Sequence, residues 1–425
     1  MQPEARPAIV TFCSLFPSRA QPYAGLFIRE RMFRVGNALH VTVVAPAPWF
    51  PLQRLLRRWR PGFRPGAPLF EQQDGHDVWY PRFVSIPGIM KGLDGFLMAL
   101  GALPTLRKLK REGRLDIIDA HFGYPDGYAA TLLGRWLNVP VTITMRGTEA
   151  RHARVPSLRR KLVRALSRAN RVFSVSESLR QVALSMGVAP ERVRVVGNGV
   201  DLAKFAPIDR ADARRRLGIA VNAPVLISVG GLVERKGFHR VLGCLAELRK
   251  SYPDLVYLIV GGASPEGDWS DRLEVLSRRL GLDECVRFLG SLPSAELPIP
   301  LSAADVFVLA TANEGWANVF LEAMACGLPV VTTDVGGNAE VVCSPALGTI
   351  VPAGDAASLA AQIRVALGRA WDRAAIRRYA EQHSWDSRVA LLTDEFCALG
   401  AHALPHFGKQ QTIDRRKSDA AASAK

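Results

Sequence analysis

The chain has 425 residues, 48% of them apolar and 22% charged, which is ordinary for a globular protein and leaves room for two or three domains. Its 55 Lys plus Arg outnumber 39 Asp plus Glu, and the resulting net charge of +16 favours polyanionic neighbours, although a basic solvated surface would carry the same charge. The longest apolar run, Gly92 to Leu106, is interrupted by Asp94 and Pro104, so the sequence predicts no membrane-spanning helix.

Short β-branched apolar runs alternate with longer amphipathic stretches along most of the chain. Continuous apolar strands separated by helices are typical of α/β proteins, whose parallel sheets are covered on both faces. The predicted strands are Ala8–Phe12, Val41–Ala45, Asp116–Ala120, Val141–Thr144, Val172–Val175, Val193–Val196, Val225–Val229, Leu255–Val260, Val286–Leu289, Val306–Leu309, Val330–Thr332 and Gly348–Val351. The predicted helices are Arg29–Leu39, Tyr128–Leu137, Leu158–Ala169, Ser176–Met186, Arg210–Leu217, Phe238–Lys250, Ser270–Leu280 and Asn318–Cys326.

The alternation is broken by a turn-like stretch, Gly197–Asp209, and resumes at Val225. This break predicts two Rossmann-like, doubly wound domains that face a central cleft. The predicted parts are an N-terminal domain over 1–200, a C-terminal domain over 201–381, a last helix over 382–400 that crosses back to the N-terminal domain, and a disordered tail over 404–425.

The six cysteines are scattered among apolar neighbours without a CxxC pair, as expected of reduced thiols in a cytosolic protein. No signal peptide is predicted, because the N-terminus runs straight into the first strand. We see no metal-ligand spacing and expect no metal.

Two segments concentrate positive charge. In Arg54–Arg64, Trp and Leu interleave with Arg, and Arg151–Arg171 reads as an amphipathic basic helix that could lie on anionic lipid. The alternative for the second segment is a helix with its apolar stripe in the core and its arginines in water. No nucleic-acid-binding motif accompanies the charge, so we expect no nucleic-acid partner.

The most informative segment follows the strand Val306–Leu309, at the edge of the sheet where open α/β folds bind ligands. Glu314 and Gly315 lie in the loop after this strand, Asn318 is expected to cap the next helix, and Glu322 falls in its first turns. The segment therefore places two carboxylates near the N-terminus of one helix.

This arrangement suits a nucleotide sugar. The helix N-terminus, at Asn318 and Val319, offers free N–H groups and a positive dipole end to a diphosphate. Gly315 lets the backbone approach the ligand closely. Glu322 can accept hydrogen bonds from a ribose diol, and Glu314 can hold sugar hydroxyls. The alternative is that both glutamates are ordinary solvated charges, but Glu322 sits in an apolar helix where an unpaired charge is costly.

A second segment follows the strand Val225–Val229. The strand runs into Gly230 and Gly231, and Arg235 and Lys236 come in the short loop before the next helix. A glycine-rich turn with basic residues after a buried strand reads as a phosphate site. Lys236 would neutralise a diphosphate.

From about Ala8 to Leu399 the chain resembles family 4 of the retaining glycosyltransferases, which have the GT-B architecture. The motifs that carry the resemblance are Glu314–Glu322, with seven residues between its glutamates and EAMACGLPVV at its end, VGG at Val229–Gly231, RKG at Arg235–Gly237, GNGVD at Gly197–Asp201, VGGNAEVV at Val335–Val342, VPAGD at Val351–Asp355 and SWD at Ser384–Asp386. The resemblance implies that Glu314 contacts the donor sugar or its phosphates, that Glu322 holds the ribose, and that Lys236 binds the diphosphate, with Arg235 as a further candidate.

The chain departs from the family pattern at two positions. Gly231 stands where the family usually has an Arg, so that one phosphate-binding cation is missing or is supplied by Arg235. Arg146 stands where the family usually has a His, three residues before Glu149. Arg cannot act as a base, but it can stabilise negative charge. The alternative is a structural Arg146 that pairs with Glu149.

Two residues are candidates for the acceptor side of the cleft. His121 follows the strand Asp116–Ala120, and either binds substrate or packs in the core. Gly25 lies in an early loop, Pro17–Phe27, which closes over donor and acceptor in similar enzymes.

The resemblance thus implies a metal-independent hexosyltransferase that uses a UDP- or GDP-sugar, with Glu314, Lys236 and Arg146 as catalytic residues and no cofactor. A saccharide or polyprenyl-linked acceptor of cell-surface polysaccharide synthesis is expected, as is a cytoplasmic location, on the membrane surface if the basic segments bind lipid. The alternatives are a sugar-nucleotide epimerase on the same fold, which would convert its donor without an acceptor, and a non-catalytic protein that binds sugar nucleotides.

Overall fold

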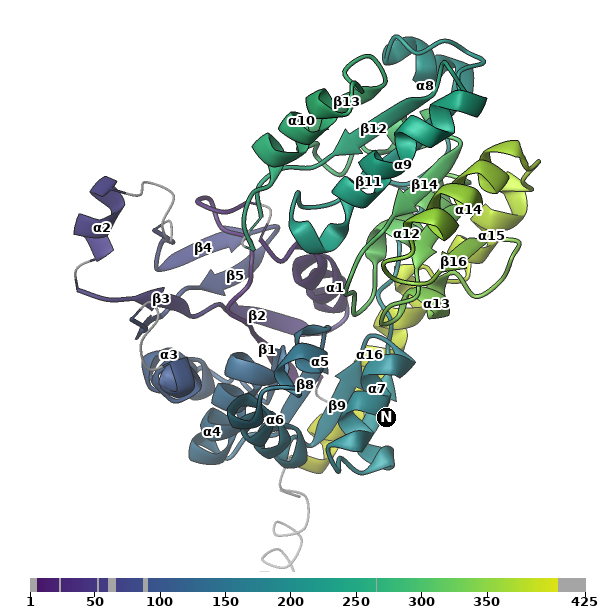
Figure 1. Cartoon of the computed structure of the whole chain (residues 1–425). Helices are drawn as coiled ribbons and strands as arrows, with labels where there is room; N and C mark the ends of the chain where they lie inside the picture. Colours follow the sequence, from purple (N-terminus) through teal and green to yellow (C-terminus); the bar gives the residue numbers. More distant parts are fainter. Residues whose placement is uncertain are drawn as a thin grey trace, which may run out of the picture.

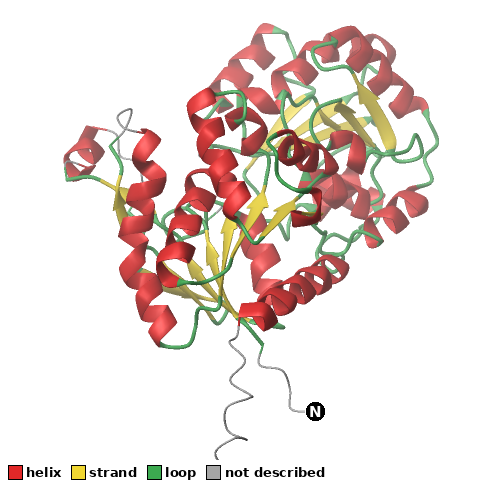
Figure 2. Cartoon of the chain, turned by 90° about the horizontal axis from the view of Figure 1, so that it is seen from below, coloured by secondary structure: helices red, strands yellow, loops and turns green. Residues whose placement is uncertain are grey.

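The computed structural model in Figure 1 describes residues 6–22, 24–51, 53–59, 66–86, 91–264 and 266–403. Two separate sheets, built mostly of parallel strands, form the centres of two Rossmann-like domains, and Figure 2 shows helices on both faces of each sheet. The predicted α/β class is therefore confirmed. The expected tail, 404–425, lies outside the described residues.

The N-terminal sheet has eight strands in the order β10-β9-β8-β7-β1-β2-β5-β4. All neighbouring strands pair in parallel except β4 and β5, which form an antiparallel hairpin at the edge. The strands are β1 Ala8–Phe12, β2 His40–Val44, β4 Phe70–Gln73, β5 His76–Trp79, β7 Ile117–His121, β8 Val141–Met145, β9 Arg171–Ser174 and β10 Val193–Val195, and β3 Ala47–Trp49 pairs with β6 Arg82–Val84 beside the sheet.

The C-terminal sheet has six parallel strands in the order β13-β12-β11-β14-β15-β16. Its strands are β11 Val225–Val229, β12 Val256–Val260, β13 Val286–Gly290, β14 Val306–Leu309, β15 Val330–Thr333 and β16 Gly348–Val351. Strands β11, β12, β14 and β15 are buried along their whole length, as expected when helices cover both faces.

The helices of the N-terminal domain are α1 Leu26–Gly36, α2 Gln53–Trp59, α3 Asp94–Arg111, α4 Tyr128–Leu137, α5 Thr148–His152, α6 Pro156–Arg168 and α7 Glu177–Ser185. Those after the first domain are α8 Arg210–Arg216, α9 Phe238–Ser251, α10 Ser270–Arg279, α11 Pro298–Ala303, α12 Asn318–Ala325, α13 Asn338–Val341, α14 Ala356–Gly368, α15 Arg373–Glu381 and α16 Trp385–Ala403.

Helix α16 packs on the N-terminal domain, although it follows the C-terminal domain in the chain (Figure 1). It contacts α1, and the fully buried ring of Phe396 meets Phe173 of β9 edge-on, with 5.9 Å between ring centroids. The last helix thus completes the core on one face of the first sheet.

The chain passes between the domains twice, and the two crossings lie side by side. The Val200 N–H donates to His383 O at 3.0 Å, and Val200 forms a parallel bridge with Ser384. The backbones are so close that a Cβ on Gly199 would lie 2.6 Å from the Trp385 Cα, which only glycine avoids.

The structure differs from the expected elements in two places and decides between the two interpretations of the basic helix. The apolar run Gly92–Leu106 is not broken at Pro104 but lies largely in α3, which continues to Arg111. The strands from β3 to β6 were not predicted, because their sequence is too polar to form a continuous apolar run. The apolar stripe of the basic helix α6 (Leu162, Ala165 and Leu166) is buried in the core, so it cannot insert into lipid. Among the described residues, no helix is long and apolar enough to cross a membrane.

Candidate functional site

A cavity of about 490 Å³ lies between the domains, at the carboxyl ends of strands from both sheets. This volume falls within the range of small-molecule sites. The predicted residues that line it are Gly25, Arg146, Gly231, Arg235, Lys236, Glu314, Gly315, Asn318 and Val319. The remaining predicted residues, Gly230, His121, Glu149 and Glu322, do not line it but lie behind or beside those that do.

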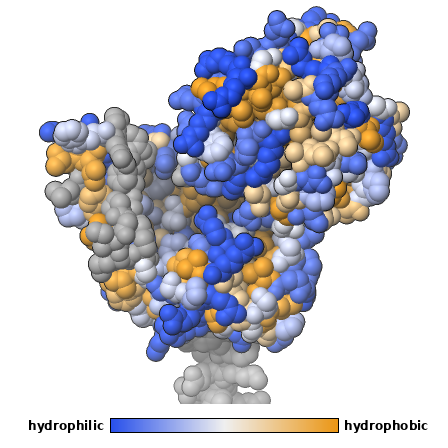
Figure 3. Space-filling model, in the orientation of Figure 1, coloured by the Kyte–Doolittle hydropathy of each residue, from blue (hydrophilic) through white to orange (hydrophobic). Residues whose placement is uncertain are grey.

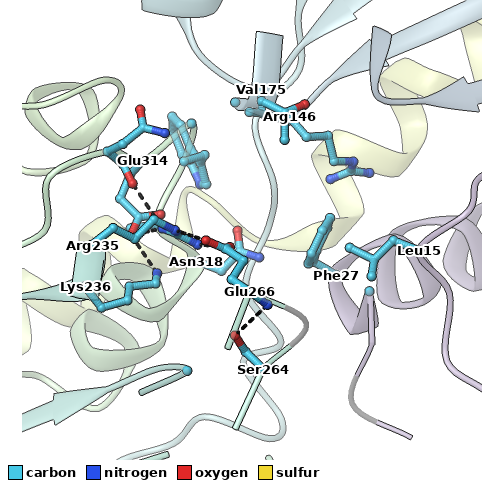
Figure 4. A pocket seen from close by; sticks show the side chains of 18 of the residues that line it. Leu15, Phe27, Arg146, Val175, Arg235, Lys236, Ser264, Glu266, Glu314 and Asn318 are labelled. Carbon is cyan, nitrogen blue, oxygen red and sulfur yellow. Dashed lines mark hydrogen bonds and ion pairs between the residues drawn. The ribbon is translucent and has the colours of Figure 1, made fainter. Parts of the chain in front are cut away.

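Glu314 and Lys236 meet on the C-terminal wall of the cavity (Figure 4). The Lys236 Nζ lies 2.6 Å from the Glu314 Oε1, which also accepts from the Thr311 hydroxyl at 3.1 Å. Arg235 extends this ion pair, since its Nη1 lies 3.4 Å from the same carboxylate oxygen while its Nε and Nη2 each donate to Glu266 at 2.6 Å. The wall thus carries two cations that are paired with two carboxylates.

Two glycines give this wall its shape. Gly230 has φ +154°, a backbone conformation that residues with a side chain rarely adopt. The aliphatic part of the Lys236 side chain packs against this glycine, since a Cβ added to Gly230 would lie 3.7 Å from the Lys236 Cε. A Cβ on Gly231 would lie 2.9 Å from the Ser264 Cβ. Ser264 and Glu266 thus border the space that a longer side chain at 231 would need.

Helix α12 begins at the cavity, but Asn318 does not cap it as predicted. The N-cap is Ala317, without a side-chain hydrogen bond, and Asn318 is the first helical residue. Its Oδ1 accepts instead from Asn198 Nδ2 at 2.8 Å, a contact across the domains that competes with capping.

Glu322 lies one turn further along α12, half-buried among apolar neighbours. Burial raises the pKa of its carboxyl to about 7, with Lys204 lowering and Glu30 raising it. This apolar, half-buried environment differs from that expected of a simple solvated helix charge.

Arg146 lies on the opposite, N-terminal wall, just after β8. Its Nε and Nη2 contact the His121 Nδ1 at 3.1 and 2.9 Å, and its Nη1 donates to Asn198 Oδ1 at 3.0 Å. Its guanidinium also lies over the ring of Phe27, 5.0 Å from the centroid. The alternative of a structural Arg146 that pairs with Glu149 holds only for the backbone: the Arg146 N–H donates to Glu149 Oε2 at 3.0 Å, while among the described residues no ion pair joins the Arg146 guanidinium to an acidic side chain.

His121 and Glu149 are fully buried behind Arg146. The Nε2 of His121 lies 3.1 Å from Asp119 Oδ2, and burial lowers the pKa of His121 to about 4, so the ring is neutral and its Nδ1 accepts. Of the two predicted roles for His121, the structure agrees with the packed core residue.

Glu149 shapes the backbone of this wall. Its carboxylate accepts from the N–H groups of Gly123, Arg146 and Gly147 at 2.7, 3.0 and 2.8 Å. These bonds hold the turn that presents Arg146, so Glu149 does not itself reach the cavity.

Gly25 precedes α1 with φ +69°, and a Cβ there would overlap the Leu15 carbonyl. Its lack of a side chain lets the loop after β1 fold back beside Phe27, so both Leu15 and Phe27 line the cavity.

The two walls touch at a pair of glycines. A Cβ on Gly315 would overlap the Arg146 carbonyl and lie 2.8 Å from the Gly147 Cα. Nearby, the Glu340 carboxylate of α13 accepts from the backbone N–H groups of Glu177 and Ser178 at 2.6 and 2.8 Å, at the start of α7. The C-terminal domain thus caps a helix of the N-terminal domain.

Sequence reasoning missed several cavity residues, namely Leu15, Phe27, Arg151, Ser264, Glu266, Asn313 and Trp316. Ser264 and Glu266 come soon after the end of β12, where the rule for open α/β sheets places ligand contacts, so that rule would have found them. Asn198 falls in the GNGVD motif, but nothing in its spacing indicated a bridge between the domains. Within the described residues, no three His, Cys, Asp or Glu side chains are grouped so that they could hold a metal ion.

Two family models match the chain, one to each domain. The model described as Glycosyltransferase Family 4 matches residues 39–204, and the model described as Glycosyl transferases group 1 matches residues 209–383.

Among similar proteins, the D-inositol 3-phosphate glycosyltransferase of Geodermatophilus obscurus is 34% identical over 316 residues, which cover 69% of this chain and 70% of the relative. The putative teichuronic acid biosynthesis glycosyltransferase TuaC of Bacillus subtilis is 27% identical over 77% of this chain and 81% of that relative.

Solved structures share the fold. Sucrose-phosphate synthase from Thermosynechococcus elongatus superposes with a TM-score of 0.74 at 21% identity, over 93% of this chain and 100% of that one. The Anabaena HepE structure in complex with UDP-glucose has a TM-score of 0.70 at 20% identity, over 92% and 100%. At these identities the likeness concerns the fold alone.

Proposed function

The chain belongs to the group 1 glycosyl transferases and has their GT-B fold, and from this we propose that it is a retaining, metal-independent transferase of cell-surface polysaccharide synthesis. It moves a hexosyl group from a nucleoside diphosphate sugar to a saccharide or a polyprenyl-linked saccharide. The observation that carries the proposal is the contact between Lys236 and Glu314, which puts a cation and a carboxylate side by side at the start of α12.

The donor binds on the C-terminal wall. Lys236 and Arg235 neutralise the diphosphate, and the free N–H groups at Asn318 and Val319 bind its oxygens. Glu314 turns from Lys236 to the hydroxyls of the sugar, and Glu322 accepts from the ribose diol. The UDP-glucose complex of HepE, which has the same fold, supports a UDP-sugar, and a GDP-sugar remains the second candidate.

Transfer needs no enzymic base. The bond between the anomeric carbon and the diphosphate oxygen breaks, and both of its electrons leave with the phosphate. The acceptor oxygen bonds to the same face of the anomeric carbon, and its hydroxyl proton passes to the departing phosphate oxygen. Lys236 and Arg235 stabilise the negative charge that develops as the phosphate leaves.

One relative is named for teichuronic acid synthesis, which supports a growing polysaccharide as the saccharide acceptor. Another is named for D-inositol 3-phosphate, so a phosphorylated polyol is the second candidate for the acceptor. The Gly25 loop and the N-terminal wall face the remaining part of the cavity, where this acceptor would sit.

A peripheral position on the cytoplasmic face of the plasma membrane is supported by exposed apolar side chains on the N-terminal domain. On α2, Leu55 and Leu56 are exposed and Trp59 is 83% exposed, with Arg57 and Arg58 between them. A second exposed stripe begins at Leu93, just before α3, and continues along the N-terminal part of the helix at Phe96 and Leu100. Figure 3 shows apolar atoms over both helices. Apolar anchors with interleaved arginines suit an anionic bilayer.

A thermal-shift screen of the purified chain against UDP, GDP and their hexose derivatives tests donor binding. One nucleoside diphosphate series should stabilise the protein, and the best sugar nucleotide should be slowly hydrolysed, with the anomeric configuration retained in the product seen by NMR. Failure of both series to stabilise the protein would overturn the proposal. Binding without hydrolysis or transfer to any acceptor would favour a non-catalytic sugar-nucleotide-binding protein.

A further inference from the structure

The two walls of the cavity differ in how their cations are compensated. On the C-terminal wall, Lys236 is paired with Glu314 and Arg235 with Glu266. On the N-terminal wall, Arg146 has no carboxylate partner among the described residues, and its contacts are the neutral groups of His121, Asn198 and Phe27. In the described part of the chain Arg146 therefore lacks a direct counter-ion, and it is less exposed than Arg151, the other arginine that lines the cavity from this domain.

The position of Arg146 is fixed before any ligand arrives. The His121 ring accepts on one edge of the guanidinium and Asn198 accepts from Nη1. A guanidinium has five N–H groups, and these contacts use three, so each terminal nitrogen keeps one N–H. These two remaining N–H groups can donate to the oxygens of a carboxylate or phosphate.

Holding this cation costs stability. Burial and the nearby Arg31 lower the pKa of Arg146 well below its usual value, and the acid behind it, Asp119, is separated from it by His121. A buried cation without a direct counter-ion is unfavourable unless a partner arrives. An anionic ligand group in the cavity would be such a partner.

The C-terminal wall offers more groups that can bind the donor diphosphate than the N-terminal wall does. Lys236, Arg235 and the N-terminus of α12 lie together there, and Figure 4 shows Arg146 across the cavity from them, beside Phe27 and Leu15. We infer that Arg146 is the binding site for a second anionic group, a carboxylate or a phosphate, which is carried by the transferred sugar or by the acceptor. This inference rests on the proposed function and specifies its substrate class.

Calorimetric titration with matched pairs of ligands tests the inference. The donor arm compares UDP-glucuronate with UDP-glucose, and GDP-mannuronate with GDP-mannose. The acceptor arm, with saturating UDP or GDP present, compares glucose 6-phosphate and glucuronate with glucose. Each ligand is measured on the wild type, Arg146→Met and Arg146→Lys, and on Arg154→Met as control, because Arg154 is an exposed arginine outside the cavity whose replacement removes the same charge.

In one arm the anionic ligand should bind the wild type about tenfold more tightly than its neutral partner, or ~1.4 kcal/mol. Arg146→Met should abolish this preference, Arg146→Lys should retain part of it, and Arg154→Met should keep it. The arm that responds identifies whether donor or acceptor carries the anion. All three variants should bind UDP or GDP as the wild type does.

Two results would overturn the inference. One is the absence of an anionic preference in both arms. The other is a loss of UDP or GDP affinity in Arg146→Met as large as the loss for the anionic ligand, since Arg146 would then bind the diphosphate. If UDP and GDP both fail to bind the wild type, the proposed function itself fails, and that result is distinct from the first two.

Discussion

At the scale of single residues, the contact between Lys236 and Glu314 is the one on which donor binding depends. Both side chains are largely buried, with 14% and 9% exposure, so neither charge is well solvated by water. A diphosphate would replace the carboxylate as partner of the Lys236 ammonium, and the freed Glu314 could then accept from sugar hydroxyls.

Replacing Lys236 by Met should weaken the binding of the preferred nucleoside diphosphate about 10- to 100-fold in a calorimetric titration, because a charge-assisted contact is lost. Part of this loss would come from Glu314, which would be left facing the phosphates. The double variant Lys236→Met, Glu314→Gln should therefore recover some affinity. Lys250→Met, at an exposed lysine of α9, is the matched control. Equal affinity of Lys236→Met and the wild type would refute the assignment.

Glu322 should make stability depend on pH. Its folded pKa of about 7 lies above the ordinary 4.5, so folding favours the protonated form. The stabilisation is fully present below pH ~4.5 and is lost as the pH rises through ~7. Glu322→Gln should therefore match the wild type near pH 4.5 in urea denaturation and exceed it by about 2–3 kcal/mol above pH 8. Glu274→Gln, at an exposed glutamate of α10, should show no such divergence.

Most residues of the C-terminal wall could be predicted from the sequence, because Gly231, Lys236, Glu314 and Gly315 follow strands whose ends meet at one sheet edge. The N-terminal wall could not be predicted in the same way. The neutral state of His121 depends on its complete burial, and the position of Arg146 depends on Asn198 from the crossing between domains, and neither contact has a sequence spacing that indicates it.

At the scale of elements, the loop before α12 and the turn after β8 set how closely the domains approach. Gly315→Ala adds a methyl group that must displace the Arg146 carbonyl or Gly147. It should hold the walls apart and reduce kcat/KM about 100-fold, on the scale expected for an ångström-sized misplacement, while leaving the melting temperature nearly unchanged.

The control is Gly243→Ala in α9, where an added Cβ would meet nothing within 4 Å. That change should leave kcat/KM as it is and slightly stabilise the helix. Small-angle scattering should show a more open shape only for Gly315→Ala. A closed shape with full activity would mean that the glycine contact has no part in closure.

Helices and strands were predicted correctly where the hydrophobic pattern was clear, and were missed where a helix-breaking residue interrupted that pattern. Strands β1, β11, β14 and β16 and helix α4 have the predicted bounds, since each is a compact apolar or amphipathic run with clear ends. Helix α3 was missed because Pro104 argued against it, whereas buried contacts of Met98, Ala102 and Leu106 hold the helix together around the proline.

At the scale of the whole molecule, the exposed apolar stripes on α2 and α3 both lie on the N-terminal domain. A membrane bound through them would therefore contact the N-terminal domain and not the C-terminal domain. The double variant Leu55→Ser, Trp59→Ser should reduce binding to vesicles with anionic lipid at least severalfold in a sedimentation assay at low salt, because it removes two exposed anchors. Val275→Ser removes a comparably exposed residue from the C-terminal domain and should have no effect. Wild-type protein that fails to bind such vesicles would refute the membrane proposal.

The paired crossings at Val200 and Ser384 also have a mechanical consequence. A single flexible linker would let one domain swivel and slide in any direction. Two parallel backbone segments that share a hydrogen bond resist twisting and sliding of one domain against the other. Hinge bending about the two crossings is then the easiest relative motion of the domains. Each opening should therefore return the domains to the same alignment, with Gly315 again facing Gly147.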